Sequence, residues 1–192
     1  PHNMPETRIL SNTSSNQRWI LDVFDFPFVA KTPRESMGKG VWLIDNRAAW
    51  ENYVATHDVL YVQEYLPIDR DLRLVVIGHK VVTAYWRQCP PGGFHANIAM
   101  GGNIDWDAIP EKAIALVETI AQTLAIDHAG FDLAEIDGHF YVFEFNRLFG
   151  NLGLIQQRIK PGPLIYEYLK SRTQPPITPP MFPTLDHLRR AA

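Results

Sequence analysis

The feature that most restricts the fold is a pair of apolar segments separated only by an Asp-Gly dipeptide, AGFDLAEI-DG-HFYVFEFN (residues 129–146). Apolar and aromatic runs of this length are typical of β-strands, and an Asp-Gly pair between them predicts a hairpin. Side chains alternate along a strand, so Glu144 and Asn146 share one face of the second segment. We therefore expect a sheet here with an apolar face and a face that carries oxygen ligands.

Asp132 supplies a third oxygen-bearing side chain, provided that it shares a face with Glu144 and Asn146. A two-residue turn would place Asp132 opposite Phe143, whereas a three-residue loop would put all three polar residues on one face. The longer loop keeps the apolar side chains together, which is worth roughly 1.5–3 kcal/mol for each large one. We therefore expect an odd loop, despite the Asp-Gly signal for a tight turn. The set suits Mg²⁺, but the polar side of an edge strand would look similar.

The rest of the chain alternates strand-like apolar runs with helical periods. Strands are expected over 26–32, 41–44 and 59–66, and over 72–88 as a pair joined tightly at 78–80. A first helix is expected over 14–23, capped by Ser14 or Ser15, and a second after a cap at Asp45, with Trp50, Tyr53 and Val54 on one face. A third should start at Pro110, with its inner face formed by Ile114, Val117, Ala121 and Leu124. A fourth is expected over 164–172.

Antiparallel pairs with helices between them predict an α+β fold. We expect a small lobe over 1–66, a larger lobe over 67–172 and a Pro-rich tail over 173–192. The space between two lobes is the natural place for a binding site.

The composition excludes several classes of function. With 192 residues, of which 46% are hydrophobic and 20% charged, the chain is an ordinary globular protein. A net charge of -3 gives no general attraction to nucleic acid or to an anionic membrane. The single cysteine, Cys89, excludes an internal disulfide, and neither a signal peptide nor a membrane span is visible, so we expect a cytoplasmic protein. Residue 1 is proline, so we expect a piece of a longer protein.

Two stretches in the first half of the chain could contact phosphate. Lys31 ends a buried strand, although a lysine there could equally extend to solvent at the sheet edge. The following loop contains Ser36, Gly38, Lys39 and Gly40, whose backbone N–H groups could close over phosphate oxygens. The loop matches neither a Walker motif nor G-x-G-x-x-G, and a Gly-containing turn between strands is common.

A hinge between strands follows at Gln63, Glu64, Tyr65 and Leu66. Exposed backbone groups at such a hinge can read the edge of a purine, and Asp71 could hold ribose hydroxyls, although a charged hairpin connection is the simpler interpretation.

Arg73 and Arg87 each lie in a strand of β-branched and aromatic residues. Alternation should aim both guanidinium groups away from the core, where they would suit a phosphate or a carboxylate.

In order along the chain, VAKTPRESMGKGV, VQEYL, DLRLVVIGHKVVTAYWRQ, FHANIAMGG, AGFDL and FEFN resemble the motifs of the ATP-grasp ligases. The resemblance covers residues 31–150 and is nearest to the RimK-type branch, which adds glutamate or related amino acids to a carboxyl group. No single motif is specific, but the ordered set is.

The resemblance implies an ATP-grasp fold of two α+β lobes that clasp a nucleotide. It implies that Lys31 and the loop through Gly40 hold ATP phosphates, that the hinge at 63–66 reads adenine, and that Asp71 contacts the ribose. Asp132, Glu144 and Asn146 would bind Mg²⁺ or Mn²⁺. Arg87, with Arg73, His95 and Asn97 as further catalytic residues, would face the carboxylate or its acyl phosphate.

Four departures separate the chain from the pattern. His95 stands where relatives usually have arginine, and Met100 replaces a commonly basic position. The segment Arg147–Gly150 differs from the usual Ser- and Pro-containing run, which leaves the acceptor unidentified. The family's preceding domain is missing, so a chain of this extent can be incomplete as an enzyme.

The leading hypothesis is an ATP- and Mg²⁺-dependent carboxylate–amine ligase that acts through an acyl phosphate on an amino acid, peptide or protein carboxyl group. The alternative is an ATP-binding module without turnover that uses nucleotide to control conformation or a partner. A third possibility is phosphoryl transfer to a hydroxyl group. The expected partners are ATP, a carboxylate acceptor and an amine donor, with homo-oligomers possible and with neither nucleic acid nor membrane.

Overall fold

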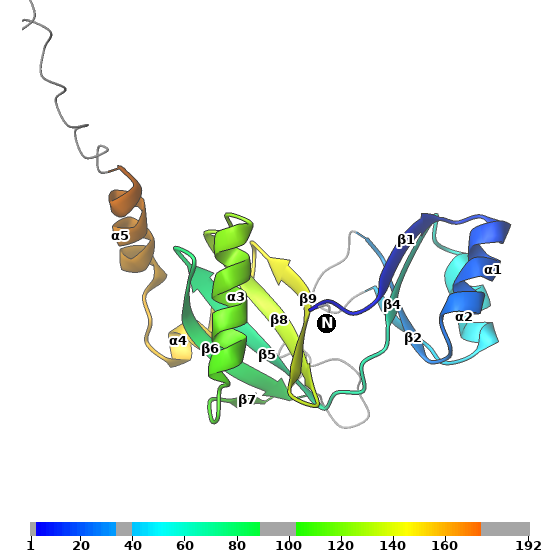
Figure 1. Cartoon of the computed structure of the whole chain (residues 1–192), viewed down its shortest axis with the longest axis horizontal. Coiled ribbons are helices and arrows are strands. Elements are labelled where there is room, and N and C mark those ends of the chain that lie inside the picture. The colour runs from blue at the N-terminus through cyan, green and yellow to red at the C-terminus, as the bar shows by residue number, and fades with distance from the viewer. Residues whose placement is uncertain (1–2, 34–39, 89–102, 174–192) are drawn as a thin grey trace, which may run out of the picture.

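The computed structural model describes residues 3–33, 40–88 and 103–173, which form two antiparallel sheets with helices (Figure 1). The smaller sheet has the strand order β1-β4-β2-β3, and the larger has the order β7-β6-β5-β8-β9. The first draws its strands from residues 7–64 and the second from residues 70–146, so each sheet uses one continuous part of the chain. The predicted α+β class is confirmed.

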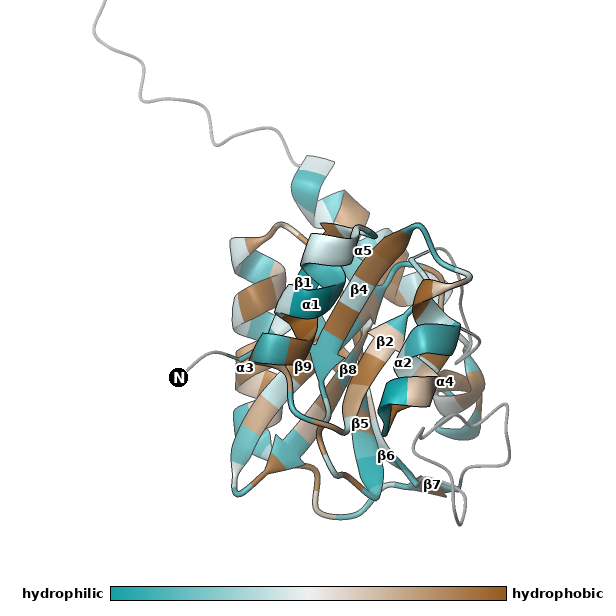
Figure 2. Cartoon of the chain, turned by 90° about the vertical axis from the view of Figure 1, so that its right-hand side faces the viewer, coloured by the Kyte–Doolittle hydropathy of each residue, from teal (hydrophilic) through white to brown (hydrophobic). Residues whose placement is uncertain are grey.

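The small sheet carries its two helices on one face, the side farther from the large sheet (Figures 1 and 2). Every second residue of its strands points to these helices, which gives a core that includes Phe28, Ala30, Leu60 and Val62. Trp50 is also fully buried there. The elements are β1 (Thr7–Ser11), α1 (Ser14–Val23), β2 (Phe28–Lys31), β3 (Val41–Ile44), α2 (Arg47–Val54) and β4 (Val59–Glu64).

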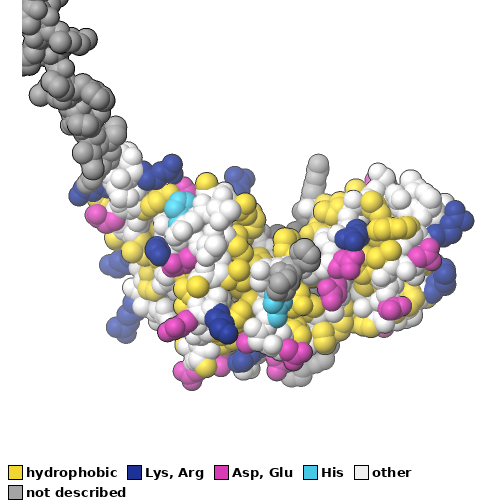
Figure 3. Space-filling view, in the orientation of Figure 1, with side chains coloured by type: hydrophobic (Ala, Val, Ile, Leu, Met, Phe, Trp, Pro, Cys, Tyr) yellow, Lys and Arg dark blue, Asp and Glu magenta, His cyan; other side chains and the backbone are white. Residues whose placement is uncertain are grey.

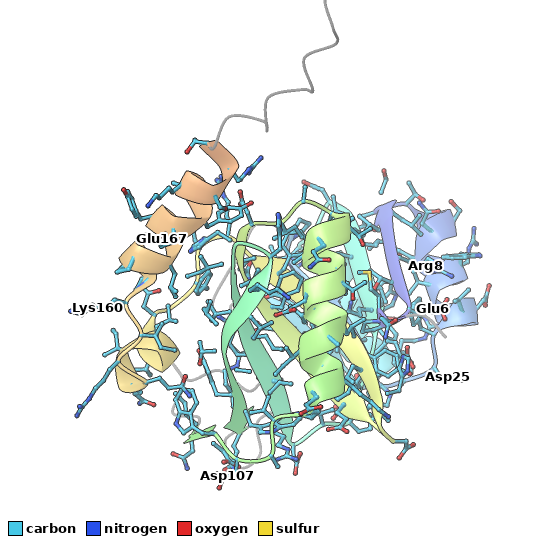
Figure 4. The ribbon with its side chains drawn as sticks, turned by 60° about the vertical axis from the view of Figure 1, so that its left-hand side comes forward. Glu6, Arg8, Asp25, Asp107, Lys160 and Glu167 are labelled. Atoms are coloured by element: carbon cyan, nitrogen blue, oxygen red, sulfur yellow. The ribbon has the colours of Figure 1, made fainter. Side chains whose placement is uncertain are left out.

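The large sheet packs one face against the long helix α3 (Glu111–Thr123) (Figures 1 and 4). Ala113, Val117 and Ala121 of the helix are fully buried against the sheet, because they recur at helical spacing. The strands are β5 (Arg70–Ile77), β6 (Lys80–Gln88), β7 (Ile104–Asp105), β8 (His128–Ile136) and β9 (His139–Asn146). The opposite face of this sheet, called the open face below, carries polar side chains instead.

The predicted odd loop between β8 and β9 is wrong. Asp137 and Gly138 form a two-residue turn in which both φ angles are positive, 50° and 75°, as the Asp-Gly signal indicates. The register then shifts by one residue, because Leu133 pairs with Val142 while Asp132 pairs with Glu144. Phe143 is the extra residue of this β-bulge. The bulge produces the Asp132–Glu144 pairing that the longer loop was expected to produce, while Phe140 and Val142 pack in the core on the other side of it.

The β5–β6 hairpin uses the same arrangement. Gly78 and His79 both have positive φ, and Val82 is the extra residue between the pairs Val75–Thr83 and Val76–Val81. As a result Leu72, Leu74 and Trp86 face α3, while Asp71, Arg73 and Arg87 lie on the open face. In both hairpins a two-residue turn connects the strands, and the bulge shifts the register and so determines which residues share a face.

Several smaller expectations are wrong by one residue or one face. Thr13, rather than Ser14 or Ser15, caps α1 by accepting from the Asn16 N–H, and Asn46 rather than Asp45 caps α2. The side chain of Leu124 is 59% exposed instead of facing the core, because the helix ends one residue before it. Strand β4 likewise ends at Glu64, short of the predicted Leu66.

Two helices follow the large sheet, the short α4 (Leu152–Gln156) and the longer α5 (Pro161–Thr173). Helix α4 lies beside β6, and α5 rests on the β5–β6 turn, where the Tyr168 hydroxyl lies 3.2 Å from Nε2 of His79. The labelled Lys160 and Glu167 mark this end of the molecule in Figure 4. None of the helices in the described ranges has the length and apolar character needed to cross a bilayer.

Acidic and basic side chains are interspersed over the face shown in Figure 3. The mixture is in line with the small net charge of the chain, -3.

Candidate functional site

The open face of the large sheet carries one row of polar side chains across four strands. Tyr85 of β6 pairs with Arg73 of β5, Arg73 pairs with Asp132 of β8, and Asp132 pairs with Glu144 of β9. Direct cross-strand partners lie on the same face, so these four side chains form a continuous line, called the charged row below. The expectation that Asp132 and Glu144 share a face agrees with this register.

An ion pair between Arg87 and Asp132 joins the charged row to the next cross-strand pair, Asp71 and Arg87. Arg87 donates to both oxygens of Asp71, with distances of 2.6 Å from Nε and 2.5 Å from Nη2. Arg73 donates through Nε and Nη2 to both oxygens of Asp132, and Arg87 Nη2 lies 3.0 Å from Asp132 Oδ1. Two arginines and two aspartates therefore share a nearly closed network whose side chains are about 10% exposed.

Each charged group in the network has a partner of opposite sign. Burial disfavours the charged form of Arg87, but Asp132 and Asp71 more than offset this effect, and the pKa of the guanidinium lies above its ordinary value. Burial raises the pKa of the Asp71 carboxyl to about 7, although the Arg87 guanidinium acts in the opposite direction. Buried charges of this kind hold one another in fixed orientations.

The metal ligands predicted from the sequence lie at the β8–β9 end of the charged row. Glu144 is exposed and Asn146 partly exposed, and the Asn146 amide donates to Glu144 Oε1 at 2.7 Å. Two opposed carboxylates with a neighbouring amide oxygen have the hard-oxygen chemistry that suits Mg²⁺, so the donor set fits such an ion. Within the described ranges, no cluster of three or more His, Cys, Asp or Glu side chains could hold a metal ion, so the amide of Asn146 would have to contribute.

Lys31 approaches this end of the row from the small sheet. Burial lowers the pKa of the Lys31 ammonium, while Glu144 and Asp132 raise it, so the two carboxylates lie within electrostatic reach of the amine. Its ammonium also lies 5.6 Å from the centre of the Tyr61 ring. The two sheets thus bring a lysine and two carboxylates together from positions about a hundred residues apart.

The predicted adenine-reading hinge is placed at the end of β4, where the chain leaves the small sheet. Gln63 is buried and donates to Thr7 Oγ1 at 3.0 Å, while the Glu64 N–H donates to the Glu6 carbonyl at 2.8 Å. Tyr65 and Leu66 continue towards β5. Asp71, predicted to contact ribose, has both oxygens bonded to Arg87 in this structure. The nucleotide roles of these residues stay predictions.

Five predicted site residues lie outside the described residues: Ser36, Gly38, Lys39, His95 and Asn97. Gly40, which ends the predicted phosphate loop, has a φ of 75°, a conformation that favours glycine. Its carbonyl accepts from the Thr32 N–H at 2.7 Å and so closes the base of the loop beside Lys31.

Three residues near the site were not predicted from the sequence. Tyr61 and Tyr85 lie in apolar strands, and only the strand register shows that they are paired with Lys31 and Arg73. Asn3 was missed because it precedes the first strand, yet its carbonyl accepts from the Val142 N–H at 2.8 Å and its amide donates to the Phe140 carbonyl at 3.0 Å. No local sequence signal identifies these contacts.

A separate hollow of about 250 Å³ opens beside the β4–β5 connection and the tip of the β8–β9 hairpin. None of the predicted site residues lines it. Its walls are Pro67, Ile68, Asp69, Arg70, Trp86, Glu135, Asp137 and Gly138.

Comparison with known families gives a match over most of the chain. The model of the RimK-like ATP-grasp domain matches residues 1–160. An Enterobacter sp. (strain 638) protein named "Probable alpha-L-glutamate ligase" is 32% identical over 149 residues, which is 74% of this chain and 50% of that protein. An Escherichia fergusonii protein named "Ribosomal protein bS6--L-glutamate ligase" is 30% identical over 149 residues, with the same coverage of 74% and 50%. The chain thus spans about half the length of these relatives.

Solved structures share the fold. A RimK domain ATP-grasp protein from Sphaerobacter thermophilus superposes with a TM-score of 0.68 at 19% identity, covering 86% of this chain and 61% of that one. The D-alanine–D-alanine ligase of Bacillus anthracis superposes with a TM-score of 0.66 at 16% identity, covering 88% and 63%. At these identities the likeness shows the architecture of two sheets alone, and this architecture is the predicted ATP-grasp fold.

Proposed function

The chain belongs to the RimK-like ATP-grasp family, and from this premise we propose that it forms the nucleotide-binding core of an ATP-dependent carboxylate–amine ligase. The proposed acceptor is a carboxyl group of an amino acid, peptide or protein, and the proposed donor is an amino acid or another amine. The name of the Escherichia fergusonii relative, which pairs a ribosomal protein with L-glutamate, supports this class of substrates. We place the reaction in the cytoplasm.

One observation carries the proposal. Asp132 and Glu144 are direct cross-strand partners on the open face, and Lys31 reaches them electrostatically from the other sheet. Two carboxylates can hold a divalent ion and a lysine can hold phosphate oxygens, so together they suit the triphosphate of Mg²⁺-ATP or Mn²⁺-ATP. A bound ion would neutralise negative charge on the β- and γ-phosphates.

The proposed chemistry needs charge neutralisation more than a nucleophilic side chain. An acceptor carboxylate oxygen attacks the γ-phosphorus of ATP, the bond to the bridging oxygen breaks, and ADP leaves. The amine nitrogen then attacks the carbonyl carbon of the acyl phosphate, loses a proton and expels phosphate. The outcome is an amide bond, ADP and phosphate.

In this proposal, Arg73 and Arg87 contact the acceptor carboxylate and orient it. Arg73 binds Asp132 through Nε and Nη2, which leaves its Nη1 group beside Gly130 on the open face. A guanidinium has five N–H donors, so an arginine can orient a protein carboxylate and still contact a substrate. Arg87, bonded to Asp71 and close to Asp132, is proposed to face the acyl phosphate.

A second function is favoured by the same network. Both oxygens of Asp132 accept from arginine, so a metal ion would have to share or displace these contacts. A module that binds ATP without turnover, and changes conformation as the contacts rearrange, is therefore the competing proposal.

ADP release distinguishes the two functions. We expect the protein to release ADP from Mg²⁺-ATP only when a carboxylate and an amine are both present. Arg87→Lys should lower the rate by at least about tenfold, because a lysine cannot reproduce the paired contacts of a guanidinium.

The matched control is Arg47→Lys, on an exposed face of α2, which should leave the rate unchanged. ATP binding with no ADP release for any mixture of carboxylates and amines would favour the binding module instead.

A further inference from the structure

Tyr61 lies at the junction of the two sheets, on the face of β4 that points away from α1 and α2. Its neighbours in sequence, Leu60 and Val62, are fully buried against those helices, so alternation turns Tyr61 to the other side. It pairs directly with Lys31 of β2 and with Ile9 of β1. Tyr61 is therefore the cross-strand neighbour of the lysine on the side that faces the charged row.

The ring and the amine are in contact range. The Lys31 ammonium lies 5.6 Å from the centre of the Tyr61 ring, within the distance at which an aromatic face attracts a cation. A lysine has four rotatable side-chain bonds, and a ring beside it restricts the positions that its ammonium can take.

Tyr53 of α2 fixes the backbones of both residues from the opposite side of the sheet. Its hydroxyl lies 2.9 Å from the Lys31 carbonyl oxygen, to which it can donate, and accepts from the Tyr61 N–H at 3.3 Å. Tyr53 is fully buried in the core of the small sheet. The strands under the Lys31–Tyr61 pair are thus held at a fixed separation, so the side chains meet in one arrangement.

Both members of the pair face the same carboxylate. Glu144 acts electrostatically on the Lys31 amine and on the Tyr61 hydroxyl, so Tyr61 also borders the exposed end of the charged row. Without a restraint, the lysine ammonium could turn to Glu144 or Asp132 and be withdrawn from a bound phosphate.

We propose that Tyr61 is a positioning residue of the nucleotide site, whose ring holds the Lys31 ammonium in place for a phosphate group. The inference rests on the proposed function and extends it to a residue with no phosphate-binding chemistry of its own. The ring, rather than the hydroxyl, carries the effect.

Calorimetric titration with Mg²⁺-ATP tests the proposal. Tyr61→Leu removes the ring and should weaken Mg²⁺-ATP binding by roughly three- to tenfold, whereas Tyr61→Phe keeps the ring and should stay within about twofold of the wild type. Tyr61→Ile is a second variant without the ring, with a side chain suited to a strand. Thermal unfolding of each variant checks that the fold is kept.

A double-mutant cycle separates positioning from a structural role. In a Lys31→Met background, Tyr61→Leu should cause no further loss of affinity, because the ring then has no ammonium to hold. The matched control is Ile9→Ala, on the other side of Tyr61 and 61% exposed, which should leave the affinity unchanged.

The outcomes are distinct. An equal loss from Tyr61→Leu in both backgrounds, or a loss from Tyr61→Phe as large as that from Tyr61→Leu, would overturn the role of the ring. Unchanged affinity in Tyr61→Leu would overturn the inference alone. Failure of the wild-type protein to bind Mg²⁺-ATP would overturn the proposed function and the inference with it.

Discussion

At the scale of single residues, the site depends on charges that are buried and paired. The guanidinium of Arg73 is bonded to the carboxyl group of Asp132, and that of Arg87 to the carboxyl group of Asp71, each through two nitrogen atoms. Such pairs contribute little net stability when complete, but removal of one partner leaves an uncompensated buried charge. The network is thus a fixed support for the exposed ligands beside it.

Asp71 should contribute to stability through its contacts with Arg87. Asp71→Asn removes the carboxylate that accepts twice from Arg87, and should lower the free energy of unfolding by about 3 kcal/mol. Urea denaturation measures the change. The control is Lys80→Ala, which breaks an exposed ion pair with Glu118 and should cost less than about 1 kcal/mol. Equal losses in the two variants would show that the network is not held as described.

The candidate residues themselves could largely be read from the sequence, but their partners could not. Lys31, Asp132 and Glu144 were found from alternation and from the ordered motifs. The bidentate contacts of Asp71 with Arg87 depend on strand register, which no local pattern specifies. The residue types indicated which side chains could bind a metal ion or phosphate, but only the tertiary structure showed which of them form ion pairs with each other.

At the scale of secondary-structure elements, both hairpins of the large sheet combine a two-residue turn with a one-residue bulge. The turns were visible in the sequence as Gly- and Asp-containing pairs. The bulges were not, because Val82 and Phe143 are ordinary strand residues. The expected longer loop was a reasonable inference from alternation, and it was wrong because a bulge can change the face of a strand without a longer connection.

Helix α4 provides a prediction at this scale. Gly153 packs so closely on the Tyr85 ring that an added Cβ would overlap it. Gly153→Ala should therefore displace α4 from β6 and destabilise the protein by roughly 1–3 kcal/mol. Gly150→Ala is the matched control, since an added Cβ there meets nothing within 4 Å.

Thermal unfolding compares the two glycine variants. A Gly153→Ala protein as stable as the Gly150→Ala protein would mean that α4 does not rest on Tyr85.

At the scale of the whole molecule, two sheets of separate origin in the chain meet around one group of charges. Lys31 comes from the small sheet, while Asp132 and Glu144 come from the large one. The segment before β1 adds a physical link, because Asn3 bonds to the edge of β9 and Glu6 bonds to the end of β4. This link lies beside the bulge that orients Glu144, so the two sheets are joined close to the proposed site.

The overall architecture was predictable because the motifs occur in family order along the chain, and the family model matches residues 1–160. The link at Asn3 was not, since it depends on how the two sheets are placed. The acceptor is not identified by either route, because the segment after Asn146 departs from the family pattern.

The central claim is that the Asp132–Glu144 end of the charged row binds the metal-nucleotide complex. Calorimetric titration of Mg²⁺-ATP into the wild-type protein and into Glu144→Gln tests it most directly. The carboxylate is exposed and outside the core, so the variant should keep its unfolding temperature and lose at least about tenfold in Mg²⁺-ATP affinity. Equal affinity in the two proteins, with both folded, would contradict the account.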